Sequence, residues 1–325
     1  MKAVWYEQFG PASDVLTLGD MEDPTPAAGE VLVRVKATGI NPSDAKLRAG
    51  ARPGATMAFP RIIPHSDGAG IIEAVGEGGD RARIGERVWI WNGQWQRAFG
   101  TAAELISLPA EQAVALPQST SFAEGACMGI PAITAWYATH GMGDLDGKCV
   151  LVTGGAGTVG RYACQMARLG GARVIATVSS EEKAAHSGAD EWINYKQDDV
   201  AQAVTDLTNG DGVDLVVDVD FGANQADTLG VIKDSGTISA YASAGEMEPT
   251  LQFYPFMFKN VTLRMLIAYL IPSEARRRGE AAITRWLEKG ALSHAVVPGG
   301  SLADVATAHD LVMSGGKLGT VVVDV

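Results

Sequence analysis

A glycine-rich loop is the first segment of this 325-residue sequence whose residue types could do chemistry. Gly155 and Gly157 lie between the apolar run CVLVT and the helical pattern TVGRYACQMARLG, and Gly160 is the third residue of that pattern. Glycines in this G-x-G-x-x-G spacing allow backbone to approach a pyrophosphate closely, and the helix start offers N–H groups to the anion. The pattern predicts dinucleotide binding rather than a merely structural turn. A P-loop is excluded, because Arg161 and Tyr162 stand where Lys and Ser or Thr are required.

The residues after the second apolar run indicate which dinucleotide is bound. An NAD site carries Asp or Glu about 20 residues beyond the loop, to hold the ribose 2′-hydroxyl. Here the run ARVIATV ends in Ser179 and Ser180, and Lys183 follows one turn later. Hydroxyls and an ammonium group suit a 2′-phosphate, so we predict NADPH, with NAD as the alternative. Ser179 and Glu182 also have the spacing of a capping box, which would begin a helix here.

The elements that position this loop follow from two different apolar patterns. Up to residue 121, short alternating runs such as EVLVRVKATG, GAGIIEAVGEG and GERVWIWNG are separated by Pro and Gly, which is typical of β-rich structure. From residue 122, helical segments follow the apolar runs KCVLVT, ARVIATVS, EWINY, VDLVVDV, GTISAYAS and VTLRMLI. This alternation predicts an α/β fold with a doubly wound, six-stranded parallel Rossmann sheet. After two further helices, the last run, GTVVVDV, would rejoin the N-terminal domain.

Composition excludes several classes of partner. The formal net charge of −12 argues against nucleic acid, which needs a basic surface. The three cysteines have neither disulfide-framework nor metal-ligand spacing. No signal peptide is evident, and the late run LRMLIAYLIP is too short to span a bilayer. We therefore expect a soluble, cytoplasmic protein with no membrane partner.

The sequence resembles the medium-chain dehydrogenase/reductase superfamily, specifically its zinc-free, zeta-crystallin-like quinone oxidoreductase branch. The resemblance covers essentially the whole chain and rests on GINPSDAKLRAG, PHSDGAGIIEAVGEG, MGIPAITAWYA, GGAGTVG and AHDLVMSGGKLGTVVV. It implies a GroES-like catalytic domain at residues 1–121, completed by 268–325, and a Rossmann domain at 122–267. It also implies NADPH bound between the domains, and a homodimer that pairs sixth strands, here VTLRMLIAYL.

Departures from the zinc-dependent relatives set the chemistry that the resemblance implies. Asn41, Ser66 and Ile130 stand where those relatives carry their three zinc ligands, and His65 would be a lone ligand. Without a Lewis acid, removing hydride from an alcohol is disfavoured, because nothing stabilises the alkoxide. Delivering hydride from NADPH to a quinone or similar conjugated carbonyl needs less, because the acceptor delocalises the charge. We therefore predict a metal-free quinone oxidoreductase.

The resemblance further assigns individual residues. Asn41 and Lys46 would border the substrate, and Thr134 would face the nicotinamide. Lys46 could donate a proton, or could simply be a solvated lysine. The cofactor residues would be Ala156, Gly157, Thr158 and Val159 at the pyrophosphate; Ser179, Ser180 and Lys183 at the 2′-phosphate, with Tyr195 near the adenosine; and Ala240, Tyr241, Ala242 and Ser243 beside the nicotinamide.

Three alternatives remain open at this level. Trp89, Trp91 and Trp95 either pack in a core or line a pocket for a flat quinone. A 2-alkenal or enone reductase would use the same fold, but it needs a proton donor that the sequence does not name. A non-catalytic NADPH-binding sensor also fits, because all the strong motifs concern the cofactor.

Overall fold

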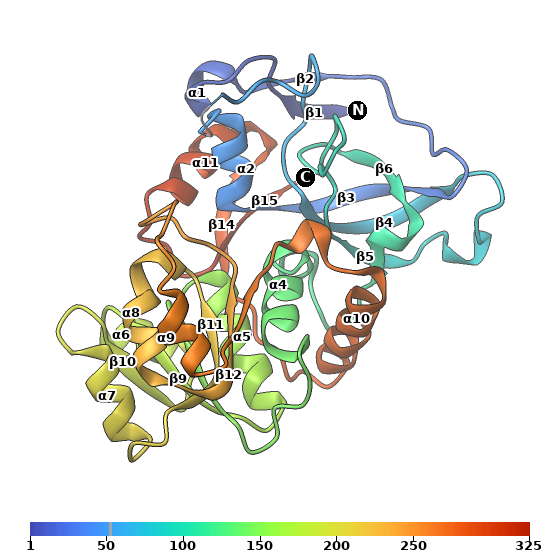
Figure 1. The fold of residues 1–325 in the computed structure, drawn as a ribbon. Helices are drawn as coiled ribbons and strands as arrows, with labels where there is room; N and C mark the ends of the chain where they lie inside the picture. The colour runs from blue at the N-terminus through green and yellow to red at the C-terminus, as the bar shows by residue number, and fades with distance from the viewer. Residues whose placement is uncertain (52–53) are drawn as a thin grey trace. The chain divides into compact units, whose positions relative to one another are not determined.

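The computed structural model describes residues 1–51 and 54–325, which divide into two compact units (Figure 1). The β-rich unit contains residues 1–130 and 280–325, and the Rossmann unit contains residues 131–279. The expected boundaries, at 121/122 and 267/268, lie before those of the units. Helices α4 (Gly129–His140) and α10 (Ser273–Glu288) each run across a boundary. The roles expected for the two domains stay predictions.

The Rossmann unit is built on a six-stranded parallel sheet of order β10-β9-β8-β11-β12-β13. Its strands are β8 (Cys149–Val152), β9 (Arg173–Val178), β10 (Glu191–Asn194), β11 (Val213–Asp218), β12 (Ile232–Ala240) and β13 (Thr262–Met265). The order reverses between β8 and β11, and ligands of such sheets bind at the carboxyl ends of the strands at this point. The predicted fold class and all six strands are confirmed.

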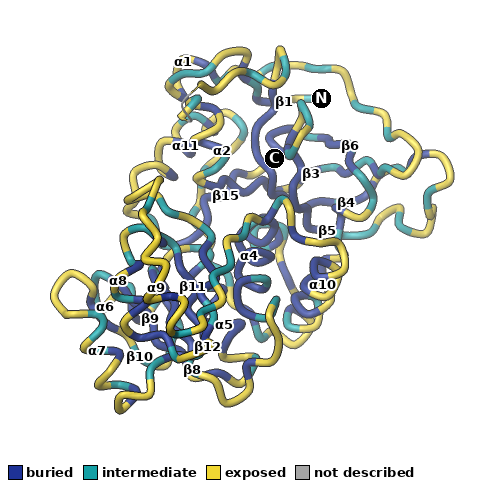
Figure 2. The backbone as a smooth tube through the Cα atoms, viewed as in Figure 1, coloured by how far each residue is buried: buried dark blue, intermediate teal, exposed yellow. Residues whose placement is uncertain are grey.

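Helices connect these strands and bury their apolar faces. They are α5 (Thr158–Leu169), α6 (Glu181–Ser187), α7 (Val200–Leu207), α8 (Phe221–Val231) and α9 (Phe253–Phe258), with a 3₁₀ turn η3 (Ala268–Leu270). Leu151, Val216 and Ile238 from the strands pack with Phe221 and Leu229 of α8. Figure 2 shows these strands buried while the outer sides of α6 and α7 are exposed. Each such buried side chain stabilises the fold by about 1.5–3 kcal/mol.

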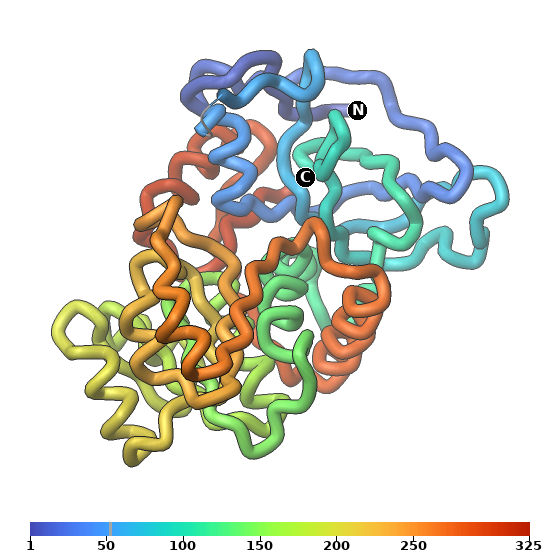
Figure 3. Tube along the Cα trace, in the orientation of Figure 1, coloured from blue at the N-terminus to red at the C-terminus, as the bar shows by residue number. Residues whose placement is uncertain are grey.

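The β-rich unit holds a seven-stranded sheet of order β14-β15-β3-β4-β5-β7, with β6 paired to β3. The strands are β3 (Glu30–Ile40), β4 (Asp67–Val75), β5 (Arg87–Ile90), β6 (Leu105–Pro109), β7 (Ala113–Ala115), β14 (Val296–Ser301) and β15 (Thr320–Asp324). Strand β15 pairs antiparallel with β3, so the C-terminal run rejoins the N-terminal part of the chain, as predicted (Figure 3).

Short elements surround this sheet. They are β1 (Lys2–Trp5), β2 (Thr17–Asp20), α1 (Ala12–Val15), α2 (Pro42–Arg48), α3 (Phe122–Gly125), α11 (Val305–Met313) and the 3₁₀ turns η1 (Arg81–Arg83), η2 (Ala110–Gln112) and η4 (Leu302–Asp304). None of the helices in the described residues combines the length and apolar character that a membrane crossing requires.

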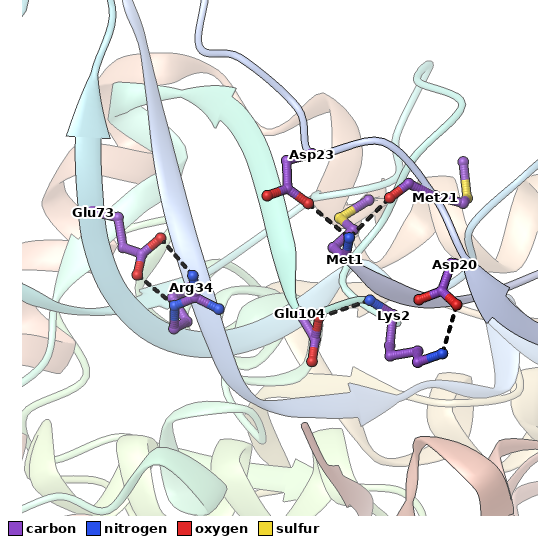
Figure 4. A network of polar contacts seen from close by, with 8 residues as sticks. All are labelled: Met1, Lys2, Asp20, Met21, Asp23, Arg34, Glu73 and Glu104. Carbon is purple, nitrogen blue, oxygen red and sulfur yellow. Dashed lines mark hydrogen bonds and ion pairs between the residues drawn. The ribbon is translucent and has the colours of Figure 1, made fainter.

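Polar contacts hold the N-terminus in place (Figure 4). The ammonium group of Met1 lies 2.7 Å from the Asp23 carboxylate, and Lys2 Nζ lies 2.7 Å from Asp20. The carboxylates of both pairs are exposed, so solvent screens each pair and its contribution to stability is small. They support the antiparallel pairing of β1 with β2 rather than carry the stability of the unit.

Candidate functional site

The glycine loop forms a turn between β8 and α5. At two of its positions, Gly155 and Gly160, only glycine fits. The N–H of Gly155 donates to the carbonyl of Thr177 at 3.0 Å, which ties the loop to β9. A Cβ atom on Gly155 would lie 2.6 Å from Cβ of Ala176, and one on Gly160 would overlap the carbonyl oxygen of Gly154. These two glycines let α5 pack closely on the strands.

The front of the same loop is open, and it fits a pyrophosphate. Gly157 is exposed and is the N-cap of α5, so the N-cap residue has no side chain that could bond the first N–H groups of the helix. A Cβ atom on Gly157 would meet only the Gly154 carbonyl oxygen, at 3.3 Å. Ala156 is buried, whereas Thr158 and Val159 are half-buried. The positive end of the helix dipole at this glycine therefore favours an anion.

The end of β9 brings together a serine and a lysine. Lys183 Nζ donates to Ser179 Oγ at 2.9 Å, directly after the strand. Ser180, not Ser179, is the N-cap of α6, and its hydroxyl accepts from the backbone N–H of Lys183 at 3.3 Å. The capping box expected from Ser179 and Glu182 is thus wrong by one residue, and Ser179 is left to pair with the lysine. Glu182 is exposed.

The ends of β11 and β12 converge on a buried carboxylate that the sequence did not single out. Asp218 is fully buried, and its Oδ1 accepts from Thr153 Oγ1 at 2.8 Å and from Asn224 Nδ2 at 2.7 Å. Its main-chain oxygen accepts from the N–H of Tyr241 at 3.0 Å. The expected nicotinamide segment 240–243 therefore lies beside the switch point of the sheet.

In the β-rich unit, one buried carboxylate connects two of the positions that hold zinc ligands in the zinc-dependent relatives. The side-chain nitrogen of Asn41 donates to Asp67 at 2.8 Å, and the N–H of Ile130 donates to both Asp67 oxygens, at 2.9 and 3.0 Å. The main-chain N–H of Asn41 donates to Asp44 at 2.8 Å. Within residues 1–51 and 54–325, no three His, Cys, Asp or Glu side chains gather as metal ligands.

Burial governs the charge of this cluster. It raises the pKa of Asp67 well above its ordinary value, and the neighbouring Asp44 raises it further, although the Asn41 hydrogen bond acts in the opposite direction. Burial also raises the pKa of Asp44 to about 7, partly offset by backbone N–H groups. Both carboxyls therefore keep their protons to higher pH than an exposed aspartate does.

His65 has a partner that the sequence did not reveal. Its Nε2 lies 2.8 Å from Nε2 of His309 on α11, and its Nδ1 lies 2.9 Å from Thr38 Oγ1. Burial lowers the pKa of His65 well below its ordinary value and that of His309 to about 3. Two neutral rings that share one hydrogen bond act as a structural tie between α11 and the segment before β4.

The other residues expected near the substrate and the nicotinamide differ in their exposure. Lys46 is exposed on α2, which agrees with a solvated lysine, and Thr134 is buried on α4 in the Rossmann unit. Trp89 and Trp91 are buried, Trp89 within β5, as packing residues would be. Trp95 is half-buried.

Comparison with known proteins identifies the family. The model of the alcohol dehydrogenase GroES-like domain matches residues 27–118, and that of the zinc-binding dehydrogenase matches residues 158–286. The quinone oxidoreductase of Rattus norvegicus is 28% identical over 327 residues, which cover 99% of this chain and 97% of that protein.

Solved structures agree over the full length. An NAD-dependent alcohol dehydrogenase is 29% identical and superposes with a TM-score of 0.89, covering 100% of both chains. A mycobacterial protein solved in complex with NADPH is also 29% identical, with a TM-score of 0.85 and 100% of both chains covered. The chain belongs to the medium-chain dehydrogenase/reductase superfamily. Within it, the chain falls in the quinone oxidoreductase branch and is a quinone oxidoreductase-like oxidoreductase.

Proposed function

We propose that this protein transfers hydride from NADPH to a quinone or a similar conjugated carbonyl, without a metal ion. The observation that carries the metal-free part is the hydrogen bonding of Asn41 and Ile130 to Asp67. An amide and an aliphatic side chain replace two metal ligands, and the buried carboxylate of Asp67 accepts hydrogen bonds from the Asn41 side chain and the Ile130 main chain. An acceptor that delocalises negative charge by itself suits such a site.

The choice of NADPH rests on the end of β9. Lys183 and Ser179 form a cation and hydroxyl pair where an NAD site holds a carboxylate. In this proposal Ser179, Ser180 and Lys183 bind the 2′-phosphate, and residues 156–159 bind the pyrophosphate through backbone N–H groups. Tyr195 lies at the adenosine, and residues 240–243 border the nicotinamide. When bound, NADPH supplies the hydride.

The remaining candidates would act on the acceptor. In this proposal Asn41 borders the substrate, and its side chain is held by hydrogen bonds to the buried carboxylates of Asp67 and Asp44. Lys46 is exposed and could exchange its proton with solvent. Thr134 would orient the nicotinamide. A quinone needs no further proton donor held by the protein, because its reduced oxygens can take protons from water.

We also propose that the protein forms a homodimer through β13. This strand ends the six-stranded sheet, and the residues around it carry exposed apolar side chains. Met265 in the strand is 72% exposed, and Phe258 just before it is 79% exposed. An edge strand beside such side chains favours pairing with a second copy.

Oxidation of NADPH by the purified protein, followed by absorbance, tests the activity. Parallel reactions contain a small benzoquinone, a polycyclic quinone or a 2-alkenal, and NADH replaces NADPH as the control. Turnover of the quinones with NADPH is the expected result. Turnover of the alkenal alone would contradict it and indicate an enone reductase. Tight NADPH binding without turnover of any acceptor would indicate a sensor.

A further inference from the structure

The Rossmann unit contains a cavity of about 390 Å³ at the carboxyl ends of its central strands. One wall is α8, which follows β11 (Figure 1). The lining residues come from the ends of β8, β9, β10 and β11, the start of α7 and one face of α8: Leu151, Thr153, Gly154, Thr177, Tyr195, Val200, Val219, Asp220, Ala223, Asn224, Asp227 and Thr228. The volume lies within the range of small-molecule sites.

This cavity adjoins the glycine loop. The N–H of Gly154 donates to Thr177 Oγ1 at 3.1 Å, and both residues line the cavity. Ser179, proposed to bind the 2′-phosphate, is two residues beyond Thr177. If NADPH lies as proposed, the ribose that carries the 2′-phosphate lies at the end of β9, and adenine is attached to this ribose. The cavity is then the space that this base can enter.

The walls suit a flat, uncharged ring. Leu151, Val200, Val219 and Ala223 supply apolar surface, and Tyr195, which is 50% exposed, supplies an aromatic face. Stacking on such a face favours a heterocyclic base without selecting which one. Lysine and arginine are absent from the lining that the described residues form, so a phosphate group gains nothing here.

The two carboxylates of the lining differ in their partners. Both oxygens of Asp220 accept from the N–H of Gly245, at 3.0 and 2.9 Å. Asp227 makes no hydrogen bond or ion pair within the described part of the chain. Burial raises its pKa, and the nearby Asp199 raises it further. Asp227 is therefore a half-buried acceptor that gains from a hydrogen-bond donor on the ligand.

We propose that Asp227 determines base specificity by accepting a hydrogen bond from the exocyclic amine of adenine. This inference rests on the proposed binding of NADPH. Adenine carries an amine at position 6, whereas hypoxanthine carries a carbonyl oxygen there, which is an acceptor. The 6-oxo group of hypoxanthine and the Asp227 carboxylate are both acceptors, so they cannot hydrogen-bond to each other. The carboxylate would then be desolvated without a donor, and the site therefore rejects hypoxanthine.

The test compares NADPH with its hypoxanthine counterpart, nicotinamide hypoxanthine dinucleotide phosphate in the reduced form. Binding to the full chain is measured by nicotinamide fluorescence and by calorimetry, without any acceptor. We expect the wild type to bind NADPH about 10- to 100-fold more tightly than the hypoxanthine form. In Asp227→Asn this preference should fall to near one, because an amide can also donate to the 6-oxo group.

Asp199→Asn is the matched control. It removes an equal charge beside the same cavity, and asparagine caps α7 as well as aspartate does. The preference should survive in this variant. A similar loss in both variants would overturn the inference in favour of a general electrostatic effect.

Other outcomes separate this inference from the proposed function. If the wild type binds NADPH and its hypoxanthine form equally, the role of Asp227 is overturned while NADPH binding stands. A preference that persists in a folded Asp227→Asn protein has the same meaning. Repeating the comparison with NADH and its hypoxanthine form removes any dependence on the 2′-phosphate. If neither pair binds, the proposed dinucleotide site itself fails, and this inference fails with it.

Discussion

Asn41 and Asp67 are joined by a 2.8 Å hydrogen bond inside the β-rich unit, with both side chains buried. Replacing Asp67 by Ala leaves the donors of Asn41 and Ile130 without their acceptor, so we expect the free energy of unfolding to fall by about 3 kcal/mol. Urea denaturation of Asp67→Ala, Asn41→Ala and the double variant measures the coupling. We expect a coupling energy of about 1–2 kcal/mol, and additive effects would contradict the pairing.

The raised pKa of Asp44 predicts a pH-dependent stability. Its folded value of about 7 exceeds the unfolded value of about 3.9, so the folded state binds more protons between these pH values. The contribution of protonated Asp44 to stability is fully present below the unfolded pKa and is lost as pH rises through about 7. The free energy of unfolding should therefore fall relative to Asp44→Asn by up to about 1.4 kcal/mol per pH unit.

Urea denaturation of both proteins at several pH values from about 4 to 8 checks this slope. His65 and His309 have lowered pKa values, so their contribution is present above the unfolded pKa and is lost as pH falls. Both proteins share it, and it cancels in the difference. A difference that does not change with pH would show that Asp44 titrates as an exposed aspartate does.

The parts of the fold that could be predicted are those with a local, periodic signal. Each strand of the Rossmann sheet is an apolar run bounded by a helical segment, and the glycine loop has a fixed spacing. The contacts of Asp67 have no such signal, because its partners Asn41 and Ile130 lie 26 and 63 residues away.

Long-range pairing also explains the other residues that were missed. His65 and His309 are 244 residues apart, and no periodicity relates them. The predicted helix start after β9 is wrong by one residue because only Ser179 has a glutamate three residues later, whereas Ser180 is followed at that distance by Lys183. Only the course of the chain decides that Ser180 caps α6, while Ser179 meets Lys183.

Two glycines of the loop should respond differently to alanine. In Gly160→Ala the new Cβ overlaps a backbone oxygen, so we expect the free energy of unfolding to fall by about 1–3 kcal/mol. In Gly157→Ala the nearest atom is 3.3 Å away and φ is −69°, so stability should change by less than about 0.5 kcal/mol. NADPH affinity should nevertheless fall at least about tenfold, because the methyl group obstructs the pyrophosphate. Thermal unfolding and NADPH titration measure the two effects, and equal behaviour of the variants would refute this division.

Lys183→Glu tests the 2′-phosphate assignment. A carboxylate at this position repels the phosphate but leaves the free 2′-hydroxyl of NADH unaffected or better bound. We expect the Kd for NADPH to rise at least about tenfold more than that for NADH, as fluorescence titration would show. Lys148 is an exposed lysine just before β8. Lys148→Glu therefore makes the same charge change at the amino end of a strand, away from the carboxyl ends where the cofactor is proposed to bind. The Kd ratio should be unchanged in that control, and an unchanged ratio in Lys183→Glu would remove the case for NADPH.

Met265→Lys tests the proposed dimer. The exposed apolar residues in β13 and close to it along the chain are Met257, Phe258, Met265, Ile267 and Leu270. A charge in the edge strand that is buried on pairing costs several kcal/mol, so this variant should sediment as a monomer where the wild type sediments as a dimer. Ile84→Lys places the same charge at a position that is 44% exposed in the β-rich unit and should leave the dimer intact. A wild type that is monomeric at all concentrations would contradict the proposal. A dimer that persists in Met265→Lys would place the interface elsewhere, because a lysine cannot be accommodated at a closed edge-to-edge pairing of β13.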